Sequence, residues 1–397
     1  MGRSRCADVV LRRDVAVIGA GHSVFGERNL SPKALFTEAF FEATESVDNG
    51  FDAEAIGEAY VGSLGFGGGQ LGNLSSFVVA EGPAKNIPAR RVENACASSG
   101  FAFRDAYLAV KSGLVDVALA GGVERMSGLT REHQRFWLGV SGDTLWERLA
   151  GVTFAGVYGL MAARHMHEYG TTKEQLARVA VKNHRFGAKN PKAQFQKEVT
   201  LEQCVNAPRV ADPLGVYDCC STTDGATVVL LARADVAKKF TDTPVWVVGS
   251  GAATDTLATH DRESLTRLDA TAKAAKSAFQ QSGLEPKQVN VAEVHDCFTI
   301  AELLALEDLG FCAKGQGGRF TEDGQSDRGG AVTVNPSGGL KAKGHPLGAT
   351  GTSQVAEIYH QLRGEVPPER QAPDAEFGLA HNVGGSGATC TVHLFAR

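Results

Sequence analysis

The chain has 397 residues, of which 43% are hydrophobic, and it carries a formal net charge of −5. A chain of this length and composition can bury a large core and is expected to divide into two or three domains. It has neither a dense Lys/Arg run nor an apolar stretch long enough to cross a membrane. We therefore expect a globular protein that binds no nucleic acid and spans no membrane.

The eight cysteines are dispersed and include no Cys-x-x-Cys pair. This pattern predicts neither a metal site nor a disulfide framework, and it fits a reducing, cytoplasmic location. The last four residues are not a peroxisomal Ser-Lys-Leu signal, which agrees with that location. The adjacent Cys219 and Cys220 are interpreted as packing residues beside a substrate channel, because neighbouring strand residues point to opposite sides.

Glycine-bounded apolar strands alternate with helical patterns along the chain, which predicts an α/β architecture. Residues 31–60 are expected to form a helix, a turn and a strand, and residues 268–294 repeat that order. A turn and a helix follow in each half, and then a glycine-rich apolar strand, at 115–123 and 377–394. Duplicated halves packed back to back would bring the two turns to one central cleft, because strand ends and helix starts of α/β units face the same side.

The segment from Arg125 to about Tyr217 interrupts this alternation and predicts an inserted loop domain. The expected division is therefore residues 1–124 with 218–243, the insertion 125–217, and residues 244–397.

Cys96 lies in the first of these turns, before a helical pattern with apolar residues at Phe101 and Leu108. The unpaired N–H groups and the dipole of a helix end favour a thiolate and can also hold an oxyanion. A small buried thiol at a packing point is the alternative interpretation of this residue taken alone.

His345 lies in the second turn, among glycines that allow close approach of a ligand, and Pro346 fixes the chain after it. If His345 is considered alone, the preferred interpretation is a histidine that lies in a glycine turn without a functional role. A cysteine and a histidine, each in a glycine-rich turn before a helix, instead form an activated-nucleophile arrangement. A third stretch, 295–298, adds a second imidazole, His295, and a second thiol, Cys297. Together these groups predict acyl transfer through a cysteine.

These residues resemble the thiolase superfamily and, within it, the sterol-carrier-protein type, which is marked by His-Asp-Cys-Phe at 295–298. The resemblance spans nearly the whole chain. Its further matches are residues 163–171, 182–184, 190–191, 218–226 and 381–385. The second cysteine of common thiolases, in a C-terminal Cys-x-Gly, is replaced here by Asn382-Val383-Gly384.

The resemblance implies a five-layered, duplicated thiolase fold (α-β-α-β-α) with an inserted loop domain. It implies Cys96 as nucleophile, His345 as its base, Cys297 as the acid/base thiol, and His295 and His345 as donors to the enolate oxygen. The backbone N–H groups of Cys96 and Gly384 would hold the tetrahedral oxyanion, and Asn382 would position its neighbours. Asp296 would orient the turn. Cys390, in an apolar run, is expected to be a buried strand residue without a catalytic role.

In thiolases the insertion binds coenzyme A, which is a substrate; no permanently bound cofactor is implied. Ser221, Arg185 and His165 are the candidate contacts with coenzyme A, and Arg131, Arg135 and Lys189 are further basic residues of the insertion that could meet its phosphates. A solvated charged face is the alternative interpretation for each.

The resemblance also implies a homodimer or tetramer, and a small zinc-ribbon and oligonucleotide-fold protein as a possible partner. The expected reaction is thiolysis of a 3-oxoacyl-CoA, or the reverse Claisen condensation of acetyl-CoA to acetoacetyl-CoA. Two alternatives remain open: a retro-aldol carbon–carbon lyase acting on an acyl-CoA, and a non-catalytic acyl-CoA or lipid carrier.

Overall fold

The computed structural model describes residues 11–80, 84 and 86–397. Ten strands form one sheet in the order β10-β9-β11-β12-β8-β1-β7-β4-β2-β3. Their bounds are β1 (Val15–His22), β2 (Glu58–Gly62), β3 (Ala89–Val92), β4 (Val117–Glu124), β7 (Gly225–Arg233), β8 (Val245–Thr254), β9 (Val291–Glu293), β10 (Thr333–Val334), β11 (Phe377–Gly384) and β12 (Thr389–Ala396).

The sheet consists of two halves that meet at β1 and β8. Strands β1 and β8 pair in antiparallel at two positions, Ala16 with Trp246 and Val17 with Val245. In the N-terminal half β2 pairs in parallel with β3 and β4, and in the C-terminal half β9 pairs in parallel with β10 and β11. The duplication predicted from the sequence is therefore present in the strand order.

Helices lie between and outside these half-sheets. The helices of the two halves are α1 (Pro32–Glu45), α2 (Leu74–Val79), α3 (Ser98–Lys111), α8 (Ala234–Ala237), α9 (Asp269–Ser282), α10 (Thr299–Asp308), α11 (Gly317–Glu322), α12 (Gly339–Ala342) and α13 (Thr350–Arg363). Helix α1 covers β1 and β7, while α9 covers β8 and β12. Helices α3 and α13 pack on each other, and α13 also touches strands of both halves, β7 and β11 among them.

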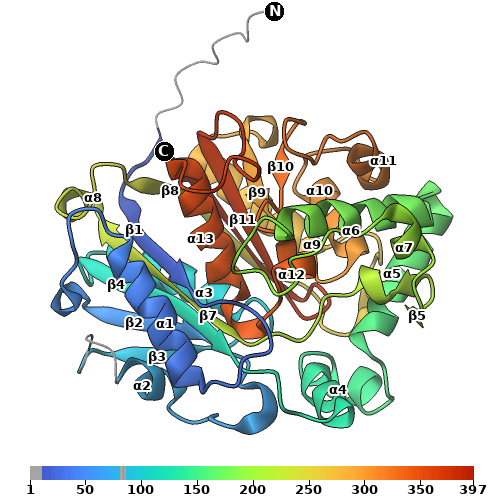
Figure 1. Cartoon of the computed structure of the whole chain (residues 1–397), viewed down its shortest axis with the longest axis horizontal. Coiled ribbons are helices and arrows are strands. Elements are labelled where there is room, and N and C mark those ends of the chain that lie inside the picture. The colour runs from blue at the N-terminus through green and yellow to red at the C-terminus, as the bar shows by residue number, and fades with distance from the viewer. Residues whose placement is uncertain (1–10, 81–83, 85) are drawn as a thin grey trace, which may run out of the picture.

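Helix α13 runs across the middle of the molecule in Figure 1. It is buried from Thr350 to Tyr359 because it lies between the two half-sheets. The order of layers is therefore helix, sheet, helix, sheet, helix, and the predicted five-layered fold is confirmed.

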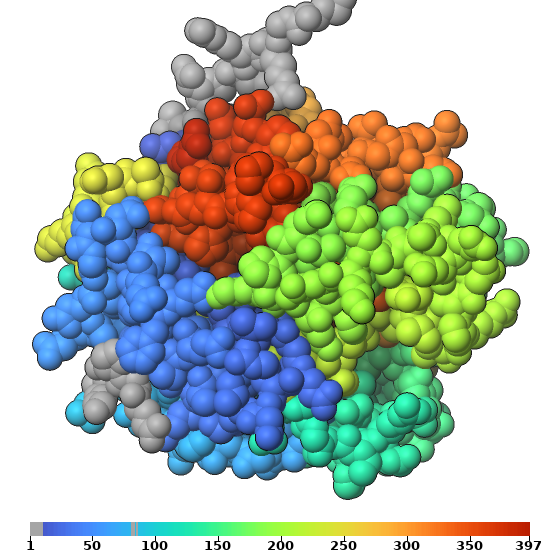
Figure 2. Space-filling view, viewed as in Figure 1, coloured from blue at the N-terminus to red at the C-terminus, as the bar shows by residue number. Residues whose placement is uncertain are grey.

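The segment between β4 and β7 departs from this alternation, as its sequence predicts. It contains α4 (Arg131–Gly139), a π-helical turn (Thr144–Arg148), α5 (Phe154–Tyr169), α6 (Lys173–Gly187), α7 (Leu201–Val205) and the short strands β5 (Arg209–Ala211) and β6 (Leu214–Gly215). Figure 2 shows this segment, in teal to yellow-green, against the orange and red C-terminal half. Among the residues described, no helix has both the length and the apolar composition needed to cross a membrane.

Candidate active site

Cys96 lies in the turn between β3 and α3, two residues before the helix begins. The turn is tight: Ala95 has a φ of 51°, and the Ser98 hydroxyl accepts the Asn94 N–H at 3.1 Å. The prediction that Cys96 precedes a helix is confirmed. The side chain is 9% exposed, so a substrate must reach it through a cavity.

Two imidazoles from the other half of the chain lie beside this thiol. His295 follows β9, and His345 lies between α12 and α13. The Cys96 Sγ and one ring nitrogen of each histidine all lie within 4.8 Å of one another. The two rings stand edge to face, with centroids 5.0 Å apart. The structure thus brings the three stretches together as predicted. One thiol and two imidazoles are also groups that can bind a metal ion.

The proton arrangement of His345 follows from its neighbour Thr350. The Thr350 hydroxyl donates to the Pro346 carbonyl at 2.9 Å, so it accepts from His345 Nδ1, 2.7 Å away. With Nδ1 protonated, the neutral ring keeps a free lone pair on Nε2. This is the tautomer that a base for the Cys96 proton requires.

We expect Thr350→Val to lower kcat by about 10- to 100-fold, because it leaves the His345 Nδ1–H buried without an acceptor, at a cost of roughly 1–3 kcal/mol. Thr350→Ser keeps the acceptor and should restore most of the activity. Steady-state kinetics of both variants, with circular dichroism to check the fold, make the comparison. Near wild-type activity in Thr350→Val, which fills the same space without a hydroxyl, would show that Thr350 only fills space.

His295 has the opposite arrangement. The Asn382 side-chain amide lies 3.2 Å from His295 Nδ1 and 3.1 Å from the Cys96 carbonyl oxygen, and donates to both. Nδ1 is then the acceptor, so Nε2 carries the proton. This Nε2 is buried and has no hydrogen-bond partner among the residues that the structure describes. It can donate to a substrate oxygen, and Asn382 connects the His295 ring to the Cys96 turn.

Cys297 comes from the same turn as His295 and shares a cavity of about 100 Å³ with Cys96 and His345. The Tyr158 hydroxyl lowers the pKa of this thiol and donates to the Gly385 carbonyl at 3.3 Å, and its ring stacks on Phe298 with centroids 4.5 Å apart. The sequence interpretation did not identify Tyr158. It lies in the inserted segment, and nothing in its local sequence indicates that α5 reaches the active site.

Burial dominates the electrostatics of the site. It raises the pKa of the Cys96 thiol to about 12 and lowers the pKa of His345 to about 3. The resting pair is therefore a neutral thiol and a neutral imidazole at pH 7. The nearby N–H groups do favour the thiolate, but the loss of solvent outweighs them and keeps the pKa of Cys96 raised.

We expect the rate of Cys96 alkylation by iodoacetamide to rise about tenfold per pH unit from pH 6 to 9 without a plateau, since the thiolate fraction grows below a raised pKa. The rate is measured by mass spectrometry of the Cys96 peptide, with Cys96→Ala as the control for labelling elsewhere. A plateau near pH 6 to 7 would contradict the neutral pair and would indicate a resting thiolate–imidazolium pair.

Backbone donors for an oxyanion lie beside the sulfur. The N–H groups of Gly385 and of Cys96 itself both lower the pKa of the thiol. Gly385 directly follows Gly384, the residue expected to hold the tetrahedral oxyanion. Gly384 is the last residue of β11, and Gly385 begins the turn, with a φ of 62°.

Asp296, between the two functional residues of the 295–298 turn, is turned away from the reacting groups. Its carboxylate accepts the backbone N–H groups of Leu340, at 2.6 Å, and Lys341, at 3.2 Å. It therefore ties the 295–298 turn to α12, and α12 leads into the His345 turn. This orienting role is the one predicted for Asp296.

Two of the three candidate contacts with coenzyme A lie elsewhere. His165 is fully buried, and its ring nitrogens are taken by Thr171 at 2.8 Å and Glu307 at 3.1 Å, so it is a core residue. The Arg185 guanidinium pairs with Asp327 at 2.5 Å and lines none of the cavities next to Cys96. Ser221 does line the Cys96 cavity, and its hydroxyl is buried without a partner. Cys390 lies in β12 and is fully buried, as predicted.

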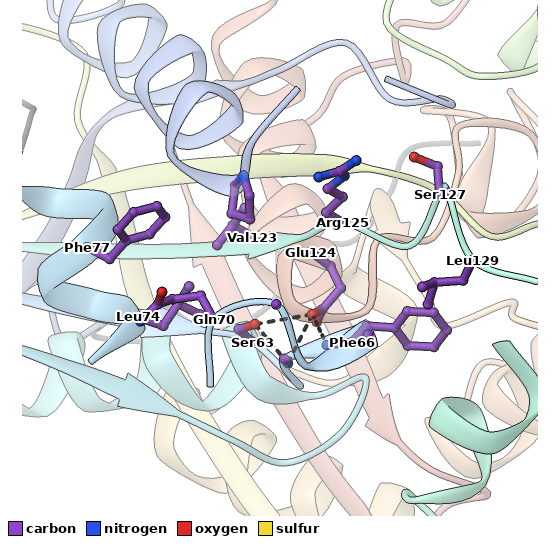
Figure 3. Close-up of a pocket in the computed structure, with 15 residues that line it drawn as sticks. Ser63, Phe66, Gln70, Leu74, Phe77, Val123, Glu124, Arg125, Ser127 and Leu129 are labelled. Carbon is purple, nitrogen blue, oxygen red and sulfur yellow. Dashed lines mark hydrogen bonds between the residues drawn. The ribbon is translucent and has the colours of Figure 1, made fainter. Parts of the chain in front are cut away.

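Glu124 fixes the position of the His345 turn from a neighbouring pocket (Figure 3). Its carboxylate accepts the N–H groups of Leu64 at 2.8 Å and Phe66 at 2.8 Å, and that of Gly348 at 3.0 Å. It thereby joins the loop after β2 to the segment that carries His345. Burial raises its pKa, and these donors oppose that shift.

Two family models cover most of the chain: the thiolase N-terminal domain matches residues 15–235, and the thiolase C-terminal domain-like model matches residues 251–397. The fold and the site thus define an acyltransferase, and the chain belongs to the thiolase family. The resemblance inferred from the sequence is confirmed.

Individual relatives agree with this assignment. Acetyl-CoA acetyltransferase of Methanothermobacter thermautotrophicus is 48% identical over 97% of this chain and 100% of the relative. Sterol carrier protein 2 of Homo sapiens is 33% identical over 98% of this chain and 73% of the relative. Among solved structures, the Ltp2-ChsH2(DUF35) aldolase is 26% identical, with a TM-score of 0.83 over 98% of this chain and 99% of that chain.

Proposed function

We propose that the protein is a thiolase that carries the acyl group on Cys96, cleaving a 3-oxoacyl-CoA with coenzyme A or condensing two acetyl-CoA molecules in reverse. The observation that carries this proposal is the meeting of the Cys96 sulfur with a ring nitrogen of His295 and of His345 within 4.8 Å, in a cavity that also contains Cys297. The 48% identical relative named acetyl-CoA acetyltransferase supports the acetyl group as one acyl group transferred.

In the first step His345 Nε2 takes the thiol proton as the Cys96 sulfur attacks the 3-oxo carbon. The carbon–carbon bond breaks, its electron pair forms the enolate of acetyl-CoA, and the Cys297 thiol protonates the enolate carbon. The protonated Nε2 of His295 donates to the enolate oxygen. Because the resting pair is neutral, the thiolate forms only as the bond to carbon forms.

In the second step coenzyme A attacks the acyl group on Cys96. The Cys297 thiolate takes the proton of the incoming thiol, and the acyl group leaves Cys96, which regains its proton from His345. The N–H groups of Gly385 and Cys96 hold the tetrahedral oxyanion formed on the way. Each residue ends the cycle in the state in which it began, so no bound cofactor is required.

Coenzyme A reaches Cys96 through a cavity of about 420 Å³ in the inserted segment. Arg135 and Arg148 line it, and it shares Leu138, Phe154 and Phe298 with the Cys96 cavity. Two guanidinium groups suit the phosphates of the nucleotide. These arginines replace Arg185 and His165 as the proposed contacts, while Ser221 keeps its place.

The test is coenzyme A-dependent cleavage of acetoacetyl-CoA by the purified protein, with the Cys96 peptide followed by mass spectrometry. Cleavage together with an acetyl adduct on Cys96 is the expected result. Cleavage without an adduct on Cys96 would contradict the covalent mechanism, and the absence of both would contradict thiolase activity.

Carbon–carbon lyase chemistry is the second candidate, because the solved aldolase matches the whole fold at a TM-score of 0.83. The complete set of Cys96, Cys297 and both histidines favours the thiolase. If the protein were a non-catalytic acyl-CoA or lipid carrier, the presence of these four residues in one cavity would have no explanation. A retro-aldol product from a 3-hydroxyacyl-CoA, formed without an adduct on Cys96, would favour the lyase.

We propose further that the protein assembles as a homodimer or tetramer. Its proposed location is the cytoplasm, and its proposed role is in lipid metabolism. The proposal also includes a small zinc-ribbon and oligonucleotide-fold partner, since the solved Ltp2-ChsH2(DUF35) aldolase is named for two components. Exposed apolar side chains of the insertion, Leu145, Trp146 and Leu149, offer that partner a surface. Light scattering tests the assembly state, and copurification with a coexpressed protein of that type tests the partner.

A further inference from the structure

A third cavity, of about 520 Å³, opens from the active site on the side of α6. It shares Cys220 and Ser221 with the Cys96 cavity. Its volume lies in the range typical of small-molecule sites. It is separate from the arginine-lined cavity assigned to coenzyme A, although Cys220 borders all three. A ligand whose reacting carbon lies at Cys96 can therefore extend into this space.

The walls of this acyl cavity are mainly apolar and hold few charges. Its apolar lining comes from five side chains, Phe195, Val199, Val210, Val216 and Tyr217, together with the two cysteines Cys219 and Cys220. His184 also lines the cavity, and burial together with the nearby Lys341 ammonium lowers its pKa to about 4. At pH 7 it is neutral. A hydrocarbon chain fits such walls.

Two lysines line this cavity: Lys197 is exposed and Lys341 is buried. Lys341 is 2% exposed, on α12, and its ammonium group donates to the Cys219 carbonyl. In the part of the chain that the structure describes, no carboxylate oxygen lies within 4.0 Å of this ammonium. Two other buried lysines do have such partners: Lys182 pairs with Glu302 at 2.9 Å, and Lys343 with Glu293 at 3.5 Å.

The carboxylates nearest to Lys341 are held by other groups. Asp218 pairs with Lys173 and accepts the Thr299 hydroxyl. Asp296 accepts two backbone N–H groups of α12. A buried ammonium normally needs a counter-charge, and Lys341 can donate further hydrogen bonds. The cavity therefore provides a cation with unused donors.

Ser221 supplies a second, independent observation. Its hydroxyl is buried at the junction of the acyl cavity and the Cys96 cavity, and it has no hydrogen-bond partner within residues 11–80, 84 and 86–397. A buried polar group without a partner is costly unless a ligand satisfies it. The route from Cys96 to Lys341 thus has an unsatisfied polar group at its entrance and an unpaired cation farther along.

We propose that this cavity receives the acyl chain of an acyl-CoA that ends in a second carboxylate, and that Lys341 pairs with that carboxylate. This inference rests on the proposed acyl-CoA chemistry and specifies the substrate class. The ion pair would supply the counter-charge that Lys341 lacks within the protein, and the apolar walls would hold the methylene groups between the two ends.

Binding of matched acyl-CoA pairs tests the proposal without turnover. In a Cys96→Ala background, calorimetry compares adipoyl-CoA with hexanoyl-CoA and glutaryl-CoA with valeryl-CoA, each pair equal in chain length. We expect the carboxylated member of at least one pair to bind about tenfold or more tightly, the range of a buried charge-assisted pair. Lys341→Met should remove this preference or reverse it. Lys197→Met, at an exposed lysine of the same cavity, should leave most of it.

Lack of a preference in the protein that retains Lys341 would overturn the inference even if every Lys341 variant misfolds. Equal weakening of all four ligands by Lys341→Met would also overturn it, because that result would place the coenzyme A moiety in this cavity. The proposed function fails by a different result, the lack of acetoacetyl-CoA cleavage, so the two failures are distinguishable.

Discussion

Replacing Cys96 with alanine is expected to reduce acetoacetyl-CoA cleavage by on the order of 10⁴-fold or more, to the background of the assay. The sulfur is the only atom of residue 96 that can carry the acyl group, and the loss of a nucleophile in a covalent mechanism is among the largest single-residue effects in enzymes. Cys297 does not replace it, because burial raises the pKa of that thiol well above its usual range and, unlike Cys96, it has no base assigned to it. Steady-state kinetics and intact-protein mass spectrometry measure the rate and the adduct.

The matched control for this variant is Cys312→Ala, a partly exposed cysteine that lines none of the cavities at the active site. It should keep near wild-type activity. A Cys96→Ala protein that retains more than a few per cent of the activity would contradict covalent catalysis through this residue and would favour direct attack by coenzyme A or lyase chemistry.

Replacing Cys297 with alanine is expected to separate the two halves of the reaction. Cys96 and His345 remain in place, so an acetyl adduct on Cys96 should still form from acetoacetyl-CoA, because the carbon–carbon bond breaks before Cys297 protonates the enolate. Turnover should fall by about 10²- to 10⁴-fold, the usual contribution of a positioned acid/base group. Rapid quench with mass spectrometry follows the adduct, and a coupled assay follows turnover.

Tyr158→Phe provides a graded comparison for Cys297. The hydroxyl of Tyr158 lowers the pKa of the Cys297 thiol, so its removal should slow turnover less than Cys297→Ala does. Equal loss of adduct formation and turnover in Cys297→Ala would refute a separate role for this thiol, and would indicate that Cys297 supports the site as a whole.

The sequence was sufficient to predict the fold because the pattern is repeated. Residues 31–60 and 268–294 each present a helix, a turn and a strand, and the structure contains α1 with β2 and α9 with β9 at these places. Local periodicity and glycine-bounded turns depend on neighbours along the chain, so they can be recognised from the chain alone. The join between the half-sheets at β1 and β8 rests on two residue pairs, for which the sequence has no pattern.

The sequence predicted only those parts of the candidate site that lie in recognisable local patterns. Cys96, His295, Cys297 and His345 lie in recognisable turns, and their residue types imply the chemistry. Arg185 and His165 were chosen from the insertion for their charge and type alone. Whether such a side chain faces a cavity, an ion pair or the core depends on packing, and here Arg185 meets Asp327 while His165 meets Glu307.

By itself the sequence determined the class of protein, the duplicated architecture and the residue types of the proposed catalytic groups. All three can be recognised from residues that are close together along the chain. Only the tertiary structure decided the protonation states and the donors. The raised pKa of Cys96, the two tautomers set by Thr350 and Asn382, and the Gly385 N–H at the sulfur follow from burial and from contacts between residues hundreds of positions apart. Burial and long-range hydrogen bonds exist only once the chain has folded, so no local pattern contains them.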